Sequence, residues 1–306
     1  MGEVVTMMLR HIVTNWIRQT AGQTLHEVVS EAVRGAQYRF GSDATLPDQA
    51  LPCNVVAVFG ESVEAGGTVD LLRSGTSMRC PNFVEHTGYL GETRVAVIES
   101  GVGRQAAATA MSDVVALHHP SWVISAGFAC ALTADLRRGH ILMADEVADA
   151  EHQCVAIGLP VDRASLAATR TQHIGRLVTV DHLVRAKEEK NRLAADYKAV
   201  ACDMETMAIA EVCQREQIRF LSVRIITDTL DEELPKEIDR LLAQKSIAAR
   251  LGVVTGAIFN RPSSIKDLWK LKEDAIKASD RLAKFVAGVV AQLPVEQGPH
   301  DSGRLE

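Results

Sequence analysis

From residue 54 onward, short apolar runs alternate with helical patterns, and this alternation restricts the possible folds more than any other feature of the chain. The runs lack the polar alternation of a half-exposed strand, which is typical of strands buried on both faces of a sheet. The pattern predicts an α/β fold, in which helices cover both faces of a mixed, mostly parallel central sheet in a three-layer α/β/α sandwich. The predicted strands occupy residues 54–59, 94–99, 122–127, 177–180, 198–202 and 220–226, and the predicted helices occupy 105–118, 186–195, 204–215 and 264–292.

The first 50 residues follow a different pattern. Apolar residues recur at helical spacing over 8–17 and again over 25–33. We expect a helical extension at 1–50 that packs on the domain or on another subunit, and attachment to a membrane surface is the alternative. The α/β domain itself is expected at 51–294, followed by a mobile tail at 295–306.

Charge and cysteine usage exclude several classes of protein. The formal net charge is −6, and no basic cluster of the kind that binds a nucleic acid duplex appears after residue 60. The six cysteines form no CxxC pair and have no zinc-like spacing, so we expect reduced thiols in a cytoplasmic protein with no metal and no cofactor. No apolar run approaches the roughly 20 residues that span a bilayer, so we expect no membrane span and no nucleic acid partner.

Glycine and polar residues gather where the predicted strands end. In α/β sheets, ligands bind beyond the carboxyl ends of the strands, so these segments are expected to share one rim. The short turn at Ser100–Gly103 lets backbone N–H groups approach an anion or a sugar hydroxyl, although a tight turn without a ligand explains it equally well. It is not a dinucleotide fingerprint, because the third glycine is missing. The rim segments are Gly60–Glu64, Ser100–Gly103, Gly127–Cys130, Cys202–Glu205 and Thr227–Asp228.

Carboxylates from separate strands are expected to meet at this rim. The segment Cys202–Glu205 ends a strand and opens a helix, where Asp203 alone is an ordinary N-cap and Glu205 a first-turn acid. Asp228 stands at the tip of an apolar strand, and Glu64 lies just past the first strand. Converging acids repel one another unless they share hydrogen bonds or protons, and such arrangements occur preferentially at functional sites.

Five segments also follow one another in the order and spacing of a known set of motifs, from about residue 54 to residue 235. They are Ser100–Arg104, Val123–Gly127 before Ala131 and Leu132, Gly139–Asp145, Cys202–Ala210 and Val223–Asp228. In this combination the chain resembles the superfamily of nucleoside phosphorylases and nucleosidases. Within it, the sequence is most similar to 5′-methylthioadenosine/S-adenosylhomocysteine nucleosidases. Phosphorylases of adenosyl-type nucleosides, including the hopanoid type, are the near alternatives, and the stretch 253–282 resembles the hopanoid type.

The resemblance implies that the chain cleaves the N-glycosidic bond of a purine nucleoside, with adenine as the implied base. Asp228 would be the general acid that protonates the departing base, and Glu64 the general base that activates water. Glu205 would accept hydrogen bonds from the ribose hydroxyls. Further substrate contacts are implied for Met204 at the sugar, Ser100 and Gly103 at the water or phosphate, Phe128 at the base, and Thr227 and Arg224 in support of Asp228.

Some of these roles have alternatives in the sequence. Glu61 lies on the same turn as Glu64 and is an alternative general base. Arg224 is equally compatible with a buried ion pair to Glu64 or Glu99, and Phe128 with a position in the core.

Water and phosphate are the alternative nucleophiles. Phosphorylases of this superfamily often carry a Gly-Asp-Pro-x-Arg loop after the first strand, whereas this chain has Gly60–Glu64, whose acids repel phosphate. We therefore expect hydrolysis. Phosphorolysis, with Arg104 or Arg224 as phosphate ligands, and a catalytically silent nucleoside-binding protein are the alternatives. The resemblance also implies a homodimer or a higher homo-oligomer.

Overall fold

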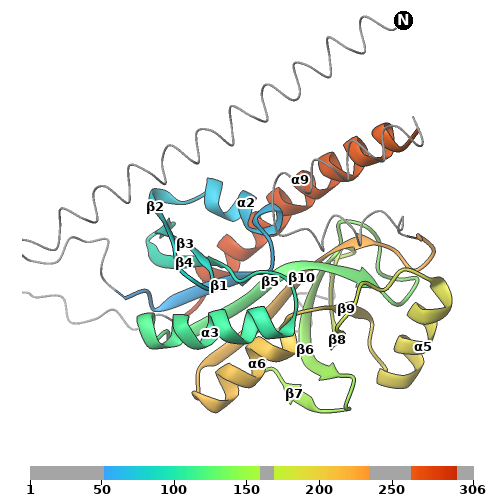
Figure 1. Ribbon diagram of the computed structural model, residues 1–306, viewed down its shortest axis with the longest axis horizontal. Helices are drawn as coiled ribbons and strands as arrows, with labels where there is room; N and C mark the ends of the chain where they lie inside the picture. The colour runs from blue at the N-terminus through green and yellow to red at the C-terminus, as the bar shows by residue number, and fades with distance from the viewer. Residues whose placement is uncertain (1–51, 159–168, 234–262, 295–306) are drawn as a thin grey trace, which may run out of the picture. The chain divides into compact units, whose positions relative to one another are not determined.

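The computed structural model describes residues 52–158, 169–233 and 263–294, and for 263–272 only the backbone is described (Figure 1). The extension expected at 1–50 and the tail expected at 295–306 lie outside these residues. The description that follows concerns the unit Gln49–Glu306.

The first half of this unit places two short helices among five strands. The elements are β1 (Val55–Phe59), α2 (Ser62–Asp70), β2 (Arg73–Arg79), β3 (Val84–Leu90), β4 (Thr93–Glu99), α3 (Arg104–His118) and β5 (Trp122–Ala131). The apolar runs predicted as strands at 54–59, 94–99 and 122–127 form β1, β4 and β5. Helix α2 and strands β2 and β3 were not predicted, because β2 is a polar, mostly exposed strand at the edge of the sheet without an apolar pattern.

The second half adds the strands that surround β5 and the long C-terminal helix. The elements are β6 (Ile141–Asp149), β7 (Cys154–Ala156), β8 (Gln172–Thr179), α5 (Lys187–Tyr197), β9 (Ala201–Asp203), α6 (Thr206–Arg215), β10 (Arg219–Asp228) and α9 (Ser263–Val290). The predicted strands at 177–180, 198–202 and 220–226 correspond to parts of β8, β9 and β10.

The sheet is mixed, as predicted, but it is not mostly parallel. Strand order is β10-β6-β8-β9-β5-β1-β4-β3-β2, and β10 also pairs with β5, so that β5, β10, β6, β8 and β9 form a closed ring. Among the described strands, antiparallel pairings are as numerous as parallel ones. The antiparallel pairs come from the short connections around β3 and β7 and from the reversed direction of β6 and β9 next to β10 and β5.

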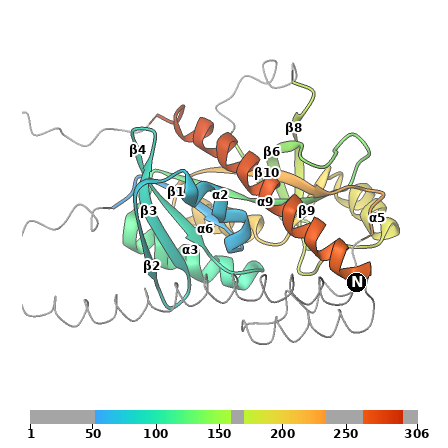
Figure 2. The same cartoon turned by 90° about the horizontal axis from the view of Figure 1, so that it is seen from above.

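Alternate residues of the central strands pack against different helices. On one face, Val55 and Ala57 of β1 belong to a core cluster with α2 and α9. On the other face, Val56 and Val58 belong to a cluster with α3 and α6. Figures 1 and 2 show α2 beside α9 on one face and α3 beside α6 on the other. Because both faces are covered, the whole of β1 is buried, which explains its continuous apolar run.

Helix α9 crosses α2 at close range. Its buried apolar residues recur every fourth position, at Ala278, Leu282, Val286 and Val290, and so form one face of the helix. Ser279 lies beside this face, where its Oγ accepts a hydrogen bond from Gly67 N (2.9 Å) and donates one to Glu64 O (3.0 Å). Helix α9 is therefore bonded directly to the turn of α2 that carries Glu64.

The close crossing makes Gly67 sensitive to substitution. A Cβ at this position would lie 2.7 Å from Ser279 O. We expect Gly67→Ala to lower the free energy of unfolding by about 1–3 kcal/mol, because α2 and α9 must separate. Gly66 is the matched control, because a Cβ there meets nothing within 4 Å. Urea unfolding of both variants tests this: equal stability of Gly66→Ala and Gly67→Ala would contradict the crossing.

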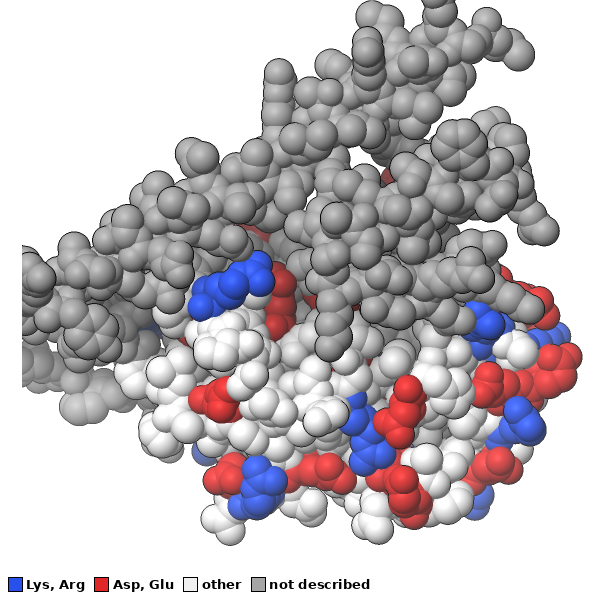
Figure 3. Space-filling model, viewed as in Figure 1, with Lys and Arg blue, Asp and Glu red and all other residues white. Residues whose placement is uncertain are grey.

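The described residues on the face seen in Figure 3 show no single dominant charge. On the face seen in Figure 3, acidic and basic side chains of the described residues are interspersed rather than gathered into one basic patch. No helix among the described residues is long and apolar enough to cross a membrane. In the same part of the chain, no cluster of three or more His, Cys, Asp or Glu side chains has the arrangement of a metal site.

Candidate active site

A cavity of about 320 Å³ opens at the rim where the central strands end. It is bounded by the segments after β1 and β8, by the C-terminal ends of β5 and β10, by the β9–α6 junction, and by α9. Its lining is mostly apolar, with acidic groups from four separate segments. The structure therefore brings together six of the residues that the sequence singled out, which are Glu64, Phe128, Met204, Glu205, Thr227 and Asp228.

The cavity forms where β5 changes partners along one edge. Strand β1 pairs with β5 only as far as Ser125, and β9 joins β5 at Cys130. Strand β10 occupies the other edge of β5 throughout. Between the two partners, Phe128 N donates a hydrogen bond to Glu64 Oε1 (2.7 Å) instead of to a strand. The Glu64 side chain thus takes the place of a neighbouring strand at this point. It also lies close to Gly127, where a Cβ would be only 3.0 Å from Glu64 Oε1.

Glu64 is held by backbone N–H groups from two directions. Its Oε2 accepts hydrogen bonds from Gly60 N and Glu61 N (both 3.0 Å), as the reciprocal acid at the start of α2. Burial raises the pKa of the Glu64 carboxyl, against the hydrogen bond from Phe128 N and the positive charge of Arg224, which lower it. Glu61 also lines the cavity, so both acids considered from the sequence border it.

Glu205 lies close to Glu64, beside Gly60. A Cβ at Gly60 would lie 3.1 Å from Glu64 Oε2 and 3.6 Å from Glu205 Oε1, so the two carboxyls are near neighbours. Glu205 Oε1 accepts a hydrogen bond from Gly103 N (2.7 Å). Gly103 has φ +94°, a backbone conformation that favours glycine, and it directs this N–H into the site just before α3 begins. Burial, and then the charges of Asp203 and Glu64, raise the pKa of Glu205 to about 8.

The raised pKa of Glu205 predicts a pH-dependent stability. A carboxyl with a folded pKa of about 8 and an ordinary unfolded pKa binds its proton more tightly in the folded state. Stability is then lost as pH rises between these values, by up to about 1.4 kcal/mol per pH unit. Glu205→Gln removes this titration, so its urea midpoint should fall less than that of the wild type between about pH 5 and pH 8. The stability of the variant still depends on pH, because Glu64 and Asp228 also have raised pKa values. An equal fall of the urea midpoint in the variant and in the wild type would contradict the prediction.

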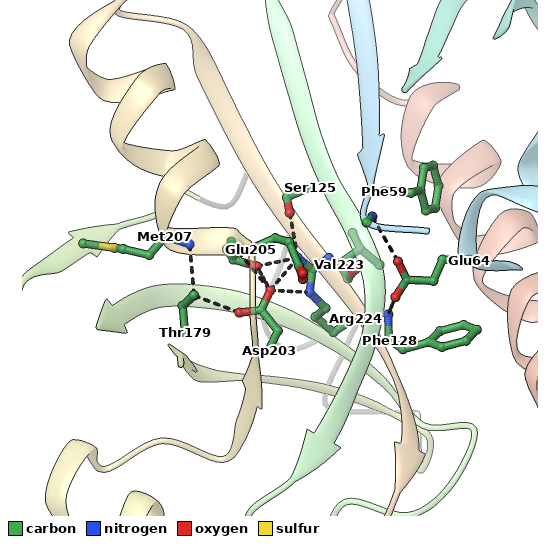
Figure 4. Close-up of polar contacts among 12 residues, drawn as sticks. Phe59, Glu64, Ser125, Phe128, Thr179, Asp203, Glu205, Met207, Val223 and Arg224 are labelled. Atoms are coloured by element: carbon green, nitrogen blue, oxygen red, sulfur yellow. Dashed lines mark hydrogen bonds and ion pairs between the residues drawn. The ribbon is translucent and has the colours of Figure 1, made fainter. Parts of the chain in front are cut away.

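Arg224 is a buried cation beneath the acids. Its Nη2 and Nε donate to Asp203 Oδ2 (2.7 and 3.1 Å), and Nη2 also donates to Ser125 Oγ (2.7 Å). Figure 4 shows Arg224 between Asp203 and Glu64. One alternative from the sequence was that Arg224 forms a buried ion pair with Glu64 or Glu99. Arg224 does form a buried ion pair, but its partner is Asp203.

The N-cap position of α6 is Glu205 rather than Asp203 as expected, and Asp203 has a wider set of contacts. Its Oδ2 accepts a hydrogen bond from Thr206 N (3.0 Å) at the start of α6, and its Oδ1 accepts one from Thr179 Oγ1 (2.8 Å). Together with the pair to Arg224, these contacts join β8, β9, β10 and α6 below the cavity. Asp203 thereby provides the negative charge that keeps the guanidinium of Arg224 buried.

Asp228 lies at the end of β10 and is almost completely buried. Its Oδ1 accepts a hydrogen bond from Thr227 Oγ1 (3.1 Å), and its Oδ2 lies 3.6 Å from Lys190 Nζ. Burial raises the pKa of the Asp228 carboxyl, although a hydrogen bond from the Cys130 thiol and the charge of Lys190 lower it. A carboxyl with a raised pKa next to an apolar cavity has the properties of a general acid.

Three other predicted site residues do not line this cavity. Ser100 is buried, its Oγ donates to Phe59 O (3.1 Å), and it borders a neighbouring hollow of about 310 Å³. Gly103 reaches the site only through its N–H to Glu205. Arg224 lies below the cavity floor, as described above.

One lysine and one arginine at or near the cavity were not predicted. Lys190 lies in the charged segment Lys187–Lys190, which has no apolar pattern, so nothing in the sequence distinguishes it from a solvated lysine. Arg138 lines the cavity from the loop before β6 and pairs with Glu232 (3.0 Å). Both residues are distinguished only by their proximity to Asp228, and this proximity is known only from the tertiary structure.

Comparison with known proteins identifies the family. A family model described as "Phosphorylase superfamily" matches residues 67–258, more than half of the chain. The chain belongs to the phosphorylase superfamily. Glu64 lies just before the matched range, so its assignment depends on the geometry described above.

Individual relatives of this superfamily member are nucleosidases. The chain is 30% identical over 185 residues to the 5′-methylthioadenosine/S-adenosylhomocysteine nucleosidase of Glaesserella parasuis, an alignment that covers 53% of this chain and 80% of the relative. It is 25% identical over 224 residues to the protein of the same name from Haemophilus influenzae, covering 65% and 96%. These relatives confirm the expectation of an enzyme that acts on an N-glycosidic bond.

Solved structures of superfamily members share the fold. The nucleosidase of the same name from Campylobacter jejuni superposes with a TM-score of 0.61 at 15% identity, covering 79% of this chain and 100% of the other. A mutant futalosine hydrolase from Helicobacter pylori gives 0.60 at 18% identity, covering 78% and 99%. At these identities the likeness shows the fold alone.

Proposed function

We propose that this chain hydrolyses the N-glycosidic bond of an adenine nucleoside such as 5′-methylthioadenosine or S-adenosylhomocysteine. The observation that carries the proposal is the convergence of Glu64, Glu205 and Asp228 on one mostly apolar cavity. A volume of about 320 Å³ is within the range of small-molecule sites. The nucleosidases named above support this substrate class.

At the base end of the cavity, Asp228 acts as the general acid. As the C1′–N9 bond breaks and its electron pair moves to the purine, the proton of Asp228 is transferred to N7. The neutral base then leaves, and Asp228 remains as a carboxylate. Thr227 orients the carboxyl through its hydrogen bond to Oδ1, and Phe128 lies beside the base.

At the sugar end, Glu205 and Glu64 act on the ribose and the water. Glu205 binds the 2′- and 3′-hydroxyls and fixes the orientation of the sugar, and Met204 packs against the sugar. Glu64 accepts a proton from the water that attacks C1′. Three of the roughly four lone-pair directions of this carboxylate are occupied by N–H donors, which leaves one for the water.

The surroundings of the arginines favour water over phosphate. Arg224 is engaged by Asp203, and Arg104 by Asp149 (3.1 Å), so neither presents a free guanidinium to the cavity. Glu61 and Glu64 add acidic groups where a phosphate would bind. One observation favours phosphorolysis as a second candidate: the neighbouring hollow that contains Ser100 is also lined by Arg79.

The nature of the nucleophile is tested by one assay. The purified chain is incubated with 5′-methylthioadenosine in phosphate-free buffer and in phosphate buffer, and free adenine is separated and quantified. Adenine released in both buffers supports hydrolysis. Release only with phosphate would replace the proposal with phosphorolysis, and binding without release would indicate a silent nucleoside-binding protein.

We also propose that the chain is a cytoplasmic homodimer or higher homo-oligomer with a three-layer α/β/α arrangement. The cysteines described above are all free thiols, which agrees with a reducing compartment. Sedimentation or size exclusion coupled to light scattering measures the oligomeric state directly.

A further inference from the structure

Lys190 is a completely buried lysine and the one buried residue of α5. Its side chain has 0% exposure, whereas its neighbours on α5 are largely accessible to solvent. Nζ donates hydrogen bonds to Thr229 O and Glu232 O (both 2.7 Å) and lies 3.6 Å from Asp228 Oδ2. Lysine is almost never fully buried without partners. All three partners here belong to the end of β10 and the turn that follows it.

The number of acceptors matches an ammonium group. A protonated lysine has three N–H donors and no acceptor, and it faces two carbonyl oxygens and one carboxyl. Two carbonyls alone compensate poorly for the loss of water around a full positive charge, and the carboxyl of Asp228 offsets this cost when it is ionised. The charge of Lys190 therefore lies next to Asp228, the group that we assign as the general acid.

Asp228 has different environments at its two oxygens. Oδ2, the oxygen nearest to Lys190, is buried. This leaves Oδ1 as the oxygen that a ligand in the cavity can reach. Lys190 itself does not line the cavity. It contacts Asp228 from behind, so it can act on the reaction only through that carboxyl.

We propose that Lys190 is a positioning residue, which fixes the Asp228 carboxyl at the cavity wall and stabilises the carboxylate that forms when Asp228 passes its proton to the departing base. This inference rests on the proposed function. Before transfer the proton is on Asp228, and after transfer it is on the purine, with a negative charge left on Asp228. The positive charge of Lys190 favours the second state over the first.

The effect on acidity follows from the groups that face Asp228. Lys190 approaches from α5, the Cys130 thiol from β5 and Arg138 from the loop before β6, and each of them lowers the pKa of Asp228 against the larger effect of burial. Without Lys190 the buried carboxyl would have a still higher pKa and would release its proton less readily. The general acid would then be weaker at every pH at which it is protonated.

The test separates the charge of Lys190 from its hydrogen bonds. In Lys190→Gln the amide can still donate to the carbonyls of Thr229 and Glu232 but has no charge, whereas Lys190→Arg keeps the charge. Lys187→Gln is the matched control, one turn earlier on α5, where an exposed lysine pairs with Asp231 in the same turn after β10. The values of kcat and KM for 5′-methylthioadenosine are measured over a wide range of pH, after urea unfolding has verified that each variant is folded.

The expected signature is a change in kcat and in its pH profile. In Lys190→Gln, kcat should fall by about 10- to 100-fold, and KM should change by less than about threefold because Lys190 does not touch the ligand. The alkaline limb of the kcat profile, where Asp228 loses its proton, should move to higher pH by about one unit or more. Lys190→Arg should keep the limb near its wild-type position, and Lys187→Gln should match the wild type.

Two results would overturn the inference. The first is a folded Lys190→Gln with the wild-type alkaline limb, even if its activity is low, because a purely structural role does not move the limb. If Lys190→Gln does not fold, a folded Lys190→Arg with a displaced limb is the second. Failure of the proposed function looks different, since the wild-type chain would then release no adenine in any buffer.

Discussion

Replacing Asp228 with asparagine is expected to lower kcat by about 10²- to 10⁴-fold, the usual contribution of a general acid. Asparagine has nearly the same shape and can still accept the hydrogen bond from Thr227, so the nucleoside should bind with a KM close to that of the wild type. It has no proton to give to the base as the glycosidic bond breaks. Steady-state release of adenine from 5′-methylthioadenosine measures the effect.

The control for Asp228→Asn is an acid in the next turn. Asp231 is exposed and pairs with Lys187, and it does not line the cavity. Asp231→Asn removes the same charge at nearly the same place in the chain and should leave kcat unchanged. Wild-type turnover in Asp228→Asn, or equal losses in both variants, would remove the general-acid assignment.

Replacing Glu64 with glutamine should reduce kcat by a similar factor of about 10²–10⁴, because the attacking water loses its proton acceptor. This substitution also has a structural effect. Both oxygens of Glu64 accept backbone N–H groups, so the amide nitrogen of glutamine must face at least one of these donors. An unsatisfied pair of this kind costs about 1–3 kcal/mol, which urea unfolding of the variant should detect.

Glu61→Gln is the comparison that decides between the two candidate bases. Glu61 borders the same cavity on the same turn, and the structure contains no hydrogen bond to Glu61 from Phe128 N, which is directed to Glu64. We expect kcat of Glu61→Gln within about threefold of the wild type. A large loss in Glu61→Gln together with near-normal turnover in Glu64→Gln would transfer the role of general base to Glu61.

The sequence predicted most of the buried strands and missed the exposed ones, and it also missed β6, although most of its residues are buried. Strands β1, β4, β5 and β10 are covered on both faces, so each leaves a continuous apolar run in the sequence. Strand β2 lies at the sheet edge with most of its side chains exposed, and its sequence has no apolar period to detect. For the same reason the sheet was expected to be mostly parallel, since the missed strands β2 and β3 form only antiparallel pairs.

Local patterns also predicted where the site would be. Carboxylates directly after buried strands must lie at the rim, because the end of a strand determines where the next side chain can be. Glu205 and Asp228 were placed in this way and both line the cavity. The partners of buried charges were not predictable: Glu64 and Glu99 were the alternative partners considered for Arg224, and it pairs with Asp203.

By itself the sequence determined strands β1, β4, β5 and β10, the acids at the strand ends and the superfamily, because each depends on residues that are close together in the chain. Only the tertiary structure decided how these acids are held. The gap between β1 and β9 that Glu64 fills, and the burial of Lys190 behind Asp228, join residues 64 and 38 positions apart. The cost of burying a charge depends on which partners surround it in space, and spacing along the chain contains no record of that.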